Sequence, residues 1–202
     1  MTALSIGERR GDRMDQIRAA ALEAFYRKGY HGTSLREIAV TVGIKVPSLY
    51  NYISSKQQLL FDLMCQVMKD LMIKTVDAVR RAGPAPVDQL RAVIRAFILY
   101  NVGHPHEAAV SDAELRALNR RNLKAIIKLR DEFDAIFSDI IVRGIGAGAF
   151  AVADVPMIKS SILTVCARIY VWYRPAGVHD PDEVASLISD YLISGLMGGT
   201  IK

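Results

Sequence analysis

The sequence has few of the features that mark membrane, secreted or metal-binding proteins. It lacks any run close to the roughly 18 uncharged apolar residues that a membrane-spanning helix needs. Its first residues include Arg9, Arg10 and Arg13 rather than the apolar stretch of a secretory signal. It has two cysteines, Cys65 and Cys166, each in an apolar helical pattern and far from a second Cys or a His cluster, which argues against a disulfide framework or a zinc site. We therefore expect a cytoplasmic protein whose cysteines are small buried hydrophobic residues.

The sequence also lacks the residue spacings of catalytic and cofactor sites. His104 and His106 flank Pro105, but two histidines across a proline rarely converge on one ion, and no further ligand is evident. The glycine-rich run 144–148 follows no strand and precedes no suitably placed lysine, so it is typical of a helix end rather than of a phosphate-binding loop. We expect no catalytic site, no metal and no cofactor. An enzyme acting on acyl-CoA remains an alternative.

No strand pattern is present, and the apolar residues recur at helical spacing throughout. With 51% hydrophobic residues, the chain of 202 residues can bury a core and is long enough for a small and a larger domain. We expect an all-α protein: a flexible arm (1–11), a three-helix helix-turn-helix domain (12–56), and a helical domain for ligand binding and dimerisation (57–202). Apart from the two short helices within 33–56, the expected helices, about nine in total, cover about 12–29, 56–81, 88–103, 107–118, 119–145, 154–173 and 180–197.

The basic charge is concentrated in the first quarter of the chain. The net charge is +5. Residues 1–56 contain nine Lys or Arg and five Asp or Glu, a balance of +4, and residues 57–202 contain 17 and 16, a balance of +1. This asymmetry favours a polyanionic partner for the N-terminal part. Arg9 and Arg10 in the arm, and Arg13 just after it, suit DNA contact and a solvated tail equally well.

Residues 33–56 have the pattern of two short helices around a glycine turn. Thr33 or Ser34 can cap the first helix, and Gly43 supplies the backbone freedom for the turn. The second helix starts at about Pro47, where a missing N–H costs little. In the first helix Leu35, Ile38, Ala39 and Val42 form an apolar stripe, and in the second Leu49 and Ile53 face inward while Lys45, Ser48, Asn51 and Tyr52 face outward. This helix-turn-helix suits a DNA major groove.

The long helix expected over 56–81 starts at the cap candidate Ser55 and ends before Gly83 and Pro84. Its 26 residues correspond to roughly 39 Å. A helix of this length extends from the DNA-binding domain into the next domain.

The segments Thr33–Ile44, Ser48–Tyr52 and Ser55–Leu60 resemble the N-terminal domain of the TetR/AcrR family of one-component repressors. The resemblance spans about residues 12–62, and its most specific part is the Leu-Tyr-x-Tyr element followed by Ser-Lys and a long helix. Two departures, Ile53 for the usual Phe and Gln57 for the usual Glu, preserve the hydrophobic and polar pattern. The resemblance implies phosphate contacts for Thr33, Ser34, Tyr50, Tyr52 and Lys56, and base-facing positions for Lys45, Val46, Pro47, Ser48 and Asn51.

Elementary chemistry supports these roles. Hydroxyl and amine groups near helix N-termini donate to phosphate oxygens, which fixes register without reading sequence. Lys45 can donate to guanine, Asn51 can pair with adenine, and Val46 or Pro47 can touch a thymine methyl. Tyr50 also suits packing under its helix, and Arg36 and Glu37 suit a solvated face.

In the second domain, the segment Arg168–Gly177, with its Trp-Tyr-Arg-Pro motif, resembles a TetR subgroup that controls lipid, sterol or fatty-acid breakdown and senses acyl-CoA thioesters. The resemblance implies a ligand role for Arg168 and Trp172. Trp172 and Tyr173 are equally compatible with a C-terminal lock or a dimer contact.

A basic face and an aromatic set are compatible with such a ligand. Arg116, Arg120, Lys124 and Lys128 recur every four residues, with Arg121 and Arg130 nearby, and a stripe of this kind can bind the phosphates of CoA. The alternative is a solvated face balanced by Asp112, Glu114, Asp131 and Glu132. The acyl tail would lie among residues that are otherwise only core: Phe97, Tyr100, Phe133, Phe137, Ile140 and Leu163.

These observations predict a ligand-responsive transcriptional repressor that binds a near-palindromic DNA operator as a homodimer through its last two helices. A small-molecule effector, with acyl-CoA as the candidate, would release it. The alternative to this function is a nucleoid-associated protein that binds DNA without sequence preference or ligand.

Overall fold

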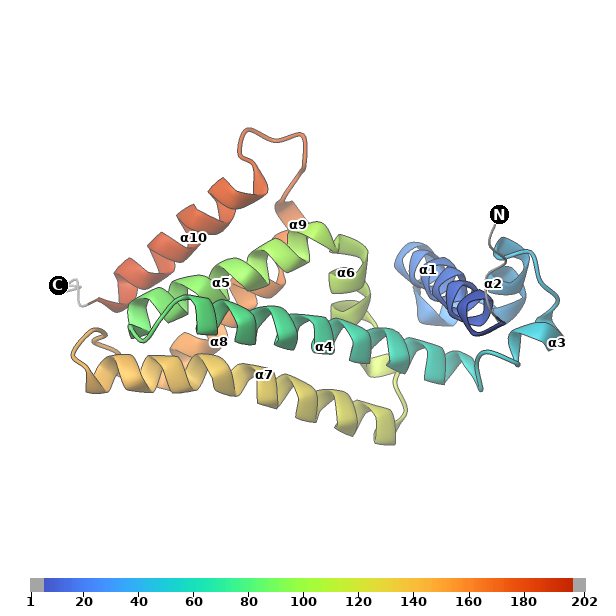
Figure 1. Cartoon of the computed structure of the whole chain (residues 1–202), viewed down its shortest axis with the longest axis horizontal. Helices are drawn as coiled ribbons and strands as arrows, with labels where there is room; N and C mark the ends of the chain where they lie inside the picture. The colour runs from blue at the N-terminus through green and yellow to red at the C-terminus, as the bar shows by residue number, and fades with distance from the viewer. Residues whose placement is uncertain (1–5, 198–202) are drawn as a thin grey trace. The chain divides into compact units, whose positions relative to one another are not determined.

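The computed structural model describes residues 6–197, with side chains from residue 11 onward. These residues form ten α-helices and one 3₁₀ turn and contain no strand, so the predicted all-α class is confirmed (Figure 1). The elements are α1 (Ile6–Gly32), α2 (Leu35–Thr41), α3 (Val46–Leu49), α4 (Lys56–Arg81), α5 (Pro86–Gly103), α6 (Pro105–Ala113), the 3₁₀ turn η1 (Leu115–Ala117), α7 (Arg120–Gly146), α8 (Val155–Ala167), α9 (Ile169–Trp172) and α10 (Pro181–Leu196).

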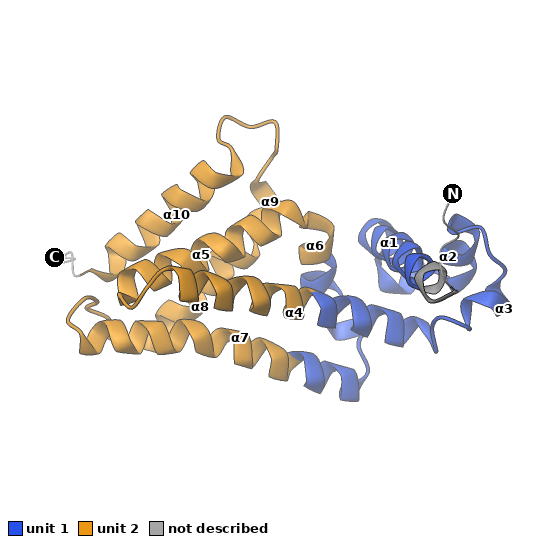
Figure 2. Ribbon diagram, in the orientation of Figure 1, with its two compact units in different colours: residues 1–66, 109–126 blue, residues 67–108, 127–202 orange. Residues whose placement is uncertain are grey.

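The chain divides into two compact units, which Figure 2 shows in different colours. The first runs up to Gln66 and includes Ala109–Ile126, and the second contains Val67–Ala108 and the chain from Ile127 onward. Helices α4 and α7 each contribute residues to both units. The functional boundary after residue 56 remains a prediction.

Helix α1 begins earlier than expected. It starts at Ile6 rather than near Asp12, so residues 6–11, which we had predicted to belong to a flexible arm, are helical. Residues 1–5 of that arm lie outside the described range. The helix was expected to stop at Gly29; this glycine, with a φ of 73°, kinks α1 there, and a further helical stretch continues to Gly32.

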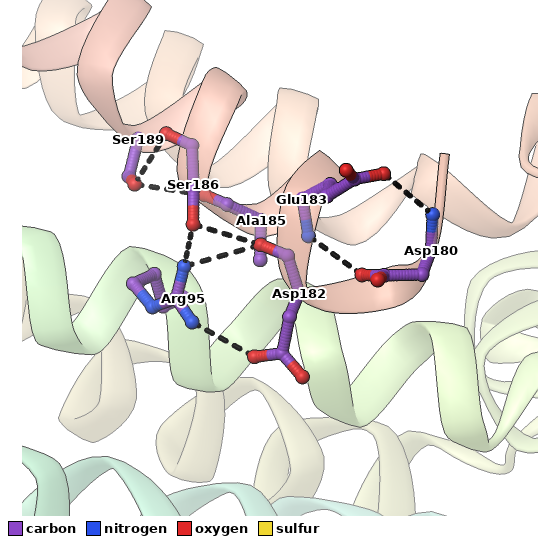
Figure 3. Close-up of polar contacts among 7 residues, drawn as sticks. All are labelled: Arg95, Asp180, Asp182, Glu183, Ala185, Ser186 and Ser189. Atoms are coloured by element: carbon purple, nitrogen blue, oxygen red, sulfur yellow. Dashed lines mark hydrogen bonds and ion pairs between the residues drawn. The ribbon is translucent and has the colours of Figure 1, made fainter. Parts of the chain in front are cut away.

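Local capping sets several helix starts. Asp154 accepts a hydrogen bond from the Met157 N–H at 2.8 Å. Asp180 accepts one from the Glu183 N–H at 2.9 Å, and the Glu183 carboxylate accepts one from the Asp180 N–H at 3.1 Å, which completes a capping box (Figure 3). The starts predicted at Asp154 and Asp180 are therefore confirmed.

The core of the second unit forms around α5. Leu90, Ile94 and Ile98 of this helix are fully buried. Two arginines one turn apart on α5 also hold α10: Arg95 donates to the Asp182 carboxylate at 2.8 Å and to the Ser186 hydroxyl (Figure 3), and Arg91 pairs with Asp190. Helix α10 is thus attached by apolar packing and by ion pairs.

The helix predicted over 154–173 is interrupted. Arg168 separates α8 from α9, and Asn101 on α5 donates to the Cys166 carbonyl at 3.1 Å, next to the break. Asn101 is 3% exposed and satisfies one of the carbonyls that a helix end leaves without an internal donor. The pattern of apolar residues did not reveal this tertiary hydrogen bond. Cys166 is fully buried, and burial raises the pKa of its thiol to about 12, whereas Cys65 is half-buried.

The glycine-rich run ends α7, as the sequence predicted. The helix ends at Gly146, and Gly148 has a φ of 70°. Gly144 has a different role: a Cβ there would overlap the ring of Phe150, which is 4% exposed. This position therefore requires glycine because the chain folds back closely against the helix.

Candidate nucleic-acid interface and effector site

The helix-turn-helix has the local structure that its sequence predicts. Ser34 caps α2 by accepting a hydrogen bond from the Glu37 N–H at 3.2 Å. Gly43 has a φ of 69°, and the next residue, Ile44, donates to the Ala39 carbonyl at 2.9 Å. The inward-facing residues Ile38, Ala39, Leu49 and Ile53 are buried, and Leu35 and Val42 are half-buried.

Helix α3 is a single turn, Val46–Leu49, and its helical direction continues through hydrogen bonds from Asn51 N to Ser48 O (3.2 Å) and from Tyr52 N to Leu49 O (2.9 Å). The residues predicted to face bases or phosphates lie at the surface here. Lys45, Pro47, Tyr50 and Asn51 are exposed, and Val46, Ser48 and Tyr52 are half-buried. Their individual contacts with DNA remain predictions.

Lys56 has a structural contact that sequence reasoning missed. Its ammonium donates to the carbonyls of Tyr30 and Thr33, both at 2.7 Å, and lies 4.2 Å from the centre of the Tyr30 ring. Lys56, at the start of α4, therefore connects α4 to the chain where α1 ends and α2 begins. An ammonium has three N–H donors, so one remains for a phosphate oxygen.

The Thr33 side chain, for which a phosphate contact was predicted, is buried in the chain, and that contact stays a prediction. Thr33 is 2% exposed, and its hydroxyl donates to the carbonyls of Ala24 (3.0 Å) and Gly29 (2.9 Å). Burial and these acceptors make the hydroxyl part of the end of α1. Ser34 is exposed, and its hydroxyl can still donate while its oxygen caps α2.

Arg13 also has an internal partner. It donates to the Val42 carbonyl at 2.9 Å, at the C-terminal end of α2. A cation at this end of a helix is favourable because the terminal carbonyls carry partial negative charge. Arg13 therefore has a structural contact between α1 and the end of α2, and its predicted contact with DNA stays a prediction. The side chains of Arg9 and Arg10 lie outside the described part.

Gln57 joins two segments of the first unit that are far apart in sequence. Its amide donates to the Ala117 carbonyl at 2.5 Å and accepts from the Asn119 N–H at 2.9 Å. Asn119 in turn accepts from the Asn122 N–H at 2.9 Å and so caps α7. The first turn of α4 is thereby bound to the start of α7. The capping signal of Asn119 was readable in the sequence, but its partner Gln57 was not.

The basic face on α7 is shorter than predicted. Arg116 lies in the 3₁₀ turn η1, before α7 begins at Arg120, so it does not extend the helical stripe. Lys128 pairs with Glu132 at 3.7 Å. In the described part of the chain, no ion pair is found for three other predicted phosphate-binding residues, Arg120, Arg121 and Lys124, and all three are exposed.

The aromatic residues predicted to hold an acyl tail form a packed cluster in the second unit. The Phe97 ring lies 5.0 Å from that of Phe133 in an edge-to-face arrangement, and the Phe133 and Phe137 rings lie 5.4 Å apart. Tyr100 is 4% exposed, and burial, together with the carboxylates of Asp70 and Glu107, raises the pKa of its hydroxyl. These residues are part of the core of this unit.

Arg168 lies at the break between α8 and α9, Trp172 is the last residue of α9, and both are exposed. Several large apolar side chains of α8, α9 and α10, and that of Met197 just after α10, are exposed, and we call this set the α8–α10 face. Its members are Met157, Val165, Val171, Trp172, Leu187, Tyr191 and Met197. Within the described range, one stretch, Val155–Trp172, is long and apolar enough for a membrane span by length and composition, with a mean hydropathy of 1.2 and 17% of it buried in the chain, and Arg168 interrupts its helix.

Comparisons place these features among known proteins. Residues 17–63 match the profile of bacterial regulatory proteins of the tetR family, and residues 83–196 match that of the tetracyclin repressor-like C-terminal domain. The chain is 24% identical over 183 residues to a fatty acid metabolism regulator protein of Bacillus subtilis (90% of this chain, 94% of that protein). It is 31% identical over 154 residues to the transcriptional activator FasR of Mycolicibacterium smegmatis (71% and 68%). The crystal structure of AibR in complex with isovaleryl coenzyme A and operator DNA superposes with a TM-score of 0.80 at 25% identity, covering 92% of this chain and 98% of that one.

Proposed function

The chain belongs to the tetR family of bacterial regulatory proteins, and from this we propose that it is a cytoplasmic repressor that binds a near-palindromic operator as a homodimer and is released by a small molecule. Members of this family are DNA-binding transcription regulators and not enzymes. The observation that carries the proposal is the helix-turn-helix, which presents an outward surface of donor side chains within the basic first quarter of the chain.

The α8–α10 face supports dimerisation. Large exposed apolar surfaces on a soluble chain mark interaction sites. This face lies on the last helices of the chain, and pairing of α8 and α10 with their counterparts across a twofold axis gives a four-helix interface. Two copies of α3 would then enter successive major grooves about 34–36 Å apart.

A coenzyme A thioester is the effector that we propose. AibR, a relative of similar fold, is described in complex with isovaleryl coenzyme A and operator DNA. The exposed cations Arg120, Arg121 and Lys124 suit the phosphates of such a ligand. The effector releases the operator only if it binds more tightly to a dimer whose recognition helices have a different spacing.

The DNA-binding role can be tested with Tyr52. After selection of an operator from a random DNA pool, we expect Tyr52→Ala to lower operator affinity by about tenfold, the equivalent of one or two lost phosphate contacts. Tyr26→Ala is the control, since Tyr26 is an exposed tyrosine (48%) on α1, outside the helix-turn-helix. Fluorescence anisotropy with labelled operator measures both. Unchanged affinity in Tyr52→Ala would contradict the assignment.

The same binding experiment separates the repressor from a nucleoid-associated protein. A repressor binds its operator on the order of a thousandfold or more tighter than bulk DNA at physiological salt. A nucleoid-associated protein shows the same salt dependence but a ratio near one. The ratio must be measured at fixed salt concentration.

The phosphate-binding role of α7 gives a second prediction. We expect the double substitution Arg121→Ala with Lys124→Ala to weaken binding of isovaleryl-CoA or lauroyl-CoA by about tenfold, since each charge-assisted hydrogen bond contributes on the order of 1 kcal/mol at an exposed site. Operator affinity should stay unchanged. Isothermal titration calorimetry provides the measurement.

The control for this pair is Arg80→Ala with Arg81→Ala, which removes the same charge from the end of α4, where both arginines pair with Asp77. Equal CoA-ester affinity in wild type and in the Arg121/Lys124 variant would show that these cations form only a solvated surface.

A further inference from the structure

Thr75 on α4 has a buried hydroxyl without a hydrogen-bond partner. Among the described residues, only two buried side-chain polar atoms lack a partner, Thr75 Oγ1 and Arg18 Nε. Arg18 is partly exposed, and its guanidinium still pairs with Asp15 at 3.1 Å. Thr75 is 0% exposed, and the hydroxyl is its only polar group. Because buried hydroxyls are nearly always hydrogen-bonded, this exception needs a physical reason.

The Thr75 hydroxyl does not make the hydrogen bond that hydroxyl side chains within helices usually make. Threonine and serine in helices donate to the carbonyl four residues earlier. Other residues of this chain do so: Thr41 bonds to Glu37 (3.0 Å), Thr164 to Ser160 (2.7 Å), and Ser189 to Ala185 (2.8 Å; Figure 3). Thr75 does not make the corresponding bond to Leu71, so its hydroxyl is not satisfied by its own helix.

Thr75 faces the apolar core of the second unit. Leu71, one turn earlier on α4, belongs to this core, and Val79, one turn later, packs against it. Residues four apart share one face of a helix, so Thr75 lies on the same stripe. The same core contains the aromatic cluster of Phe97, Phe133 and Phe137. The hydroxyl is therefore a single unsatisfied donor beside an apolar and aromatic interior.

We propose that Thr75 is the specificity-determining residue that recognises the polar head of the effector's acyl chain, by donating a hydrogen bond to its carbonyl oxygen inside this core. The inference rests on the proposed function, in which a coenzyme A thioester is the effector. The apolar and aromatic side chains accept the hydrocarbon, and the hydroxyl is the one group that pairs with an acceptor.

The charges of the same unit indicate a neutral carbonyl rather than a free carboxylate. Asp70 on α4 and Glu107 on α6 lie close enough to Tyr100 to raise the pKa of its hydroxyl. Two carboxylates beside this core make a third anion unfavourable. A thioester carbonyl is uncharged and accepts one hydrogen bond, so we expect discrimination against the free fatty acid.

The test compares CoA probes with and without a carbonyl. Isovaleryl-CoA and lauroyl-CoA are each paired with the S-alkyl thioether of the same chain length, which keeps the CoA and loses the carbonyl oxygen. We expect wild-type protein to bind each thioester about tenfold more tightly than its thioether, as one hydrogen bond allows. Thr75→Val keeps the shape of the side chain but lacks the hydroxyl, so it should bind the thioester only as tightly as the thioether. Thr75→Ser keeps the hydroxyl and should still bind the thioester more tightly.

Thermal stability provides a second readout. Because valine removes an unsatisfied buried hydroxyl, Thr75→Val should melt at a higher temperature than wild type in the absence of effector. Ser189→Ala is the matched control: Ser189 is also 0% exposed, but its hydroxyl donates to Ala185 and Ser186 carbonyls. This control should not melt higher and should keep the thioester preference.

Three results would overturn the inference, and they separate it from the proposed function. If Thr75→Val retains the thioester preference, the hydroxyl does not recognise the carbonyl, while the acyl-CoA response itself stands. If Thr75→Val melts lower, a bound water or a protein acceptor already satisfies the hydroxyl. If wild type binds its operator but none of the four probes, the effector class is wrong and the inference fails with it, but the DNA-binding regulator remains.

Discussion

Replacing Leu187 and Tyr191 with glutamate is expected to convert the protein to a monomer and to lower operator affinity by about 100-fold, or about 2.8 kcal/mol. The two residues lie one turn apart on α10 and are 56% and 79% exposed in the single chain. Tyr191 also lines a shallow hollow of the α8–α10 face together with Ile158 and Ile162. In a twofold interface the double substitution places four carboxylates in an apolar contact, where unpaired charges are strongly unfavourable.

Operator affinity depends on dimerisation because each protomer supplies one recognition helix. A monomer contacts one half-site only, so the second set of contacts is lost. Analytical ultracentrifugation measures the oligomeric state, and fluorescence anisotropy measures operator binding on the same samples. The control is Ile73→Glu with Val76→Glu, which changes two exposed apolar residues of α4 (68% and 53%) that lie outside the face. A dimer that persists in the α10 variant would contradict the proposed interface.

Lys56→Met is expected to lower the free energy of unfolding by about 2 kcal/mol and operator affinity by tenfold or more. Methionine keeps much of the aliphatic stem but removes two hydrogen bonds from a charged donor, each contributing about 1.5–3 kcal/mol when buried, and a cation–π contact of about 0.5–1 kcal/mol. Since Lys56 is half-buried, solvent compensates for part of these lost contacts, and the net cost is smaller than their sum, about 2 kcal/mol. The substitution removes the bonds of the ammonium to the Tyr30 and Thr33 carbonyls, where α1 ends and α2 begins. It also removes the N–H donor proposed for a DNA phosphate.

Lys45→Met distinguishes these two effects. Lys45 is exposed at the start of α3 and has no side-chain capping bond. Its substitution should weaken operator binding without changing stability, whereas Lys56→Met should change both. Urea denaturation, followed by circular dichroism, gives the stability of each variant. If Lys56→Met unfolds at the same urea concentration as wild type, the bonds to Tyr30 and Thr33 do not stabilise the domain.

The parts of the fold that were predictable depend on neighbours in sequence. Gly43 turns the chain because a glycine adopts a positive φ at low cost, and Ser34 and Asp180 start helices through bonds to residues three positions ahead. The apolar residues of 56–81 recur at helical spacing, and α4 was expected there and was found at Lys56–Arg81. Such signals are local: the two residues that interact are only a few positions apart, so both can be recognised in the sequence.

The contacts that were not predicted depend on partners distant in sequence. Thr33 was predicted to contact phosphate because its hydroxyl stands near a helix start, but it is buried against carbonyls of α1. Arg13 bonds to a carbonyl 29 residues away, and Gln57 to backbone groups 60 and 62 residues away. Every residue has a backbone carbonyl. The sequence therefore does not indicate which carbonyl will accept a hydrogen bond from a given side chain.

The all-α class, the helix-turn-helix and the family resemblance were predictable from the amino-acid sequence, because helix periodicity, caps and the motif of residues 33–60 involve neighbouring residues. The polar side chains that remain available for a ligand could be identified only from the folded chain. Lys56, Thr33 and Arg13 have internal acceptors, and the Thr75 hydroxyl has none. The physical reason is that hydrogen bonding is a matter of distance and direction between groups, and folding alone brings groups of distant sequence positions together.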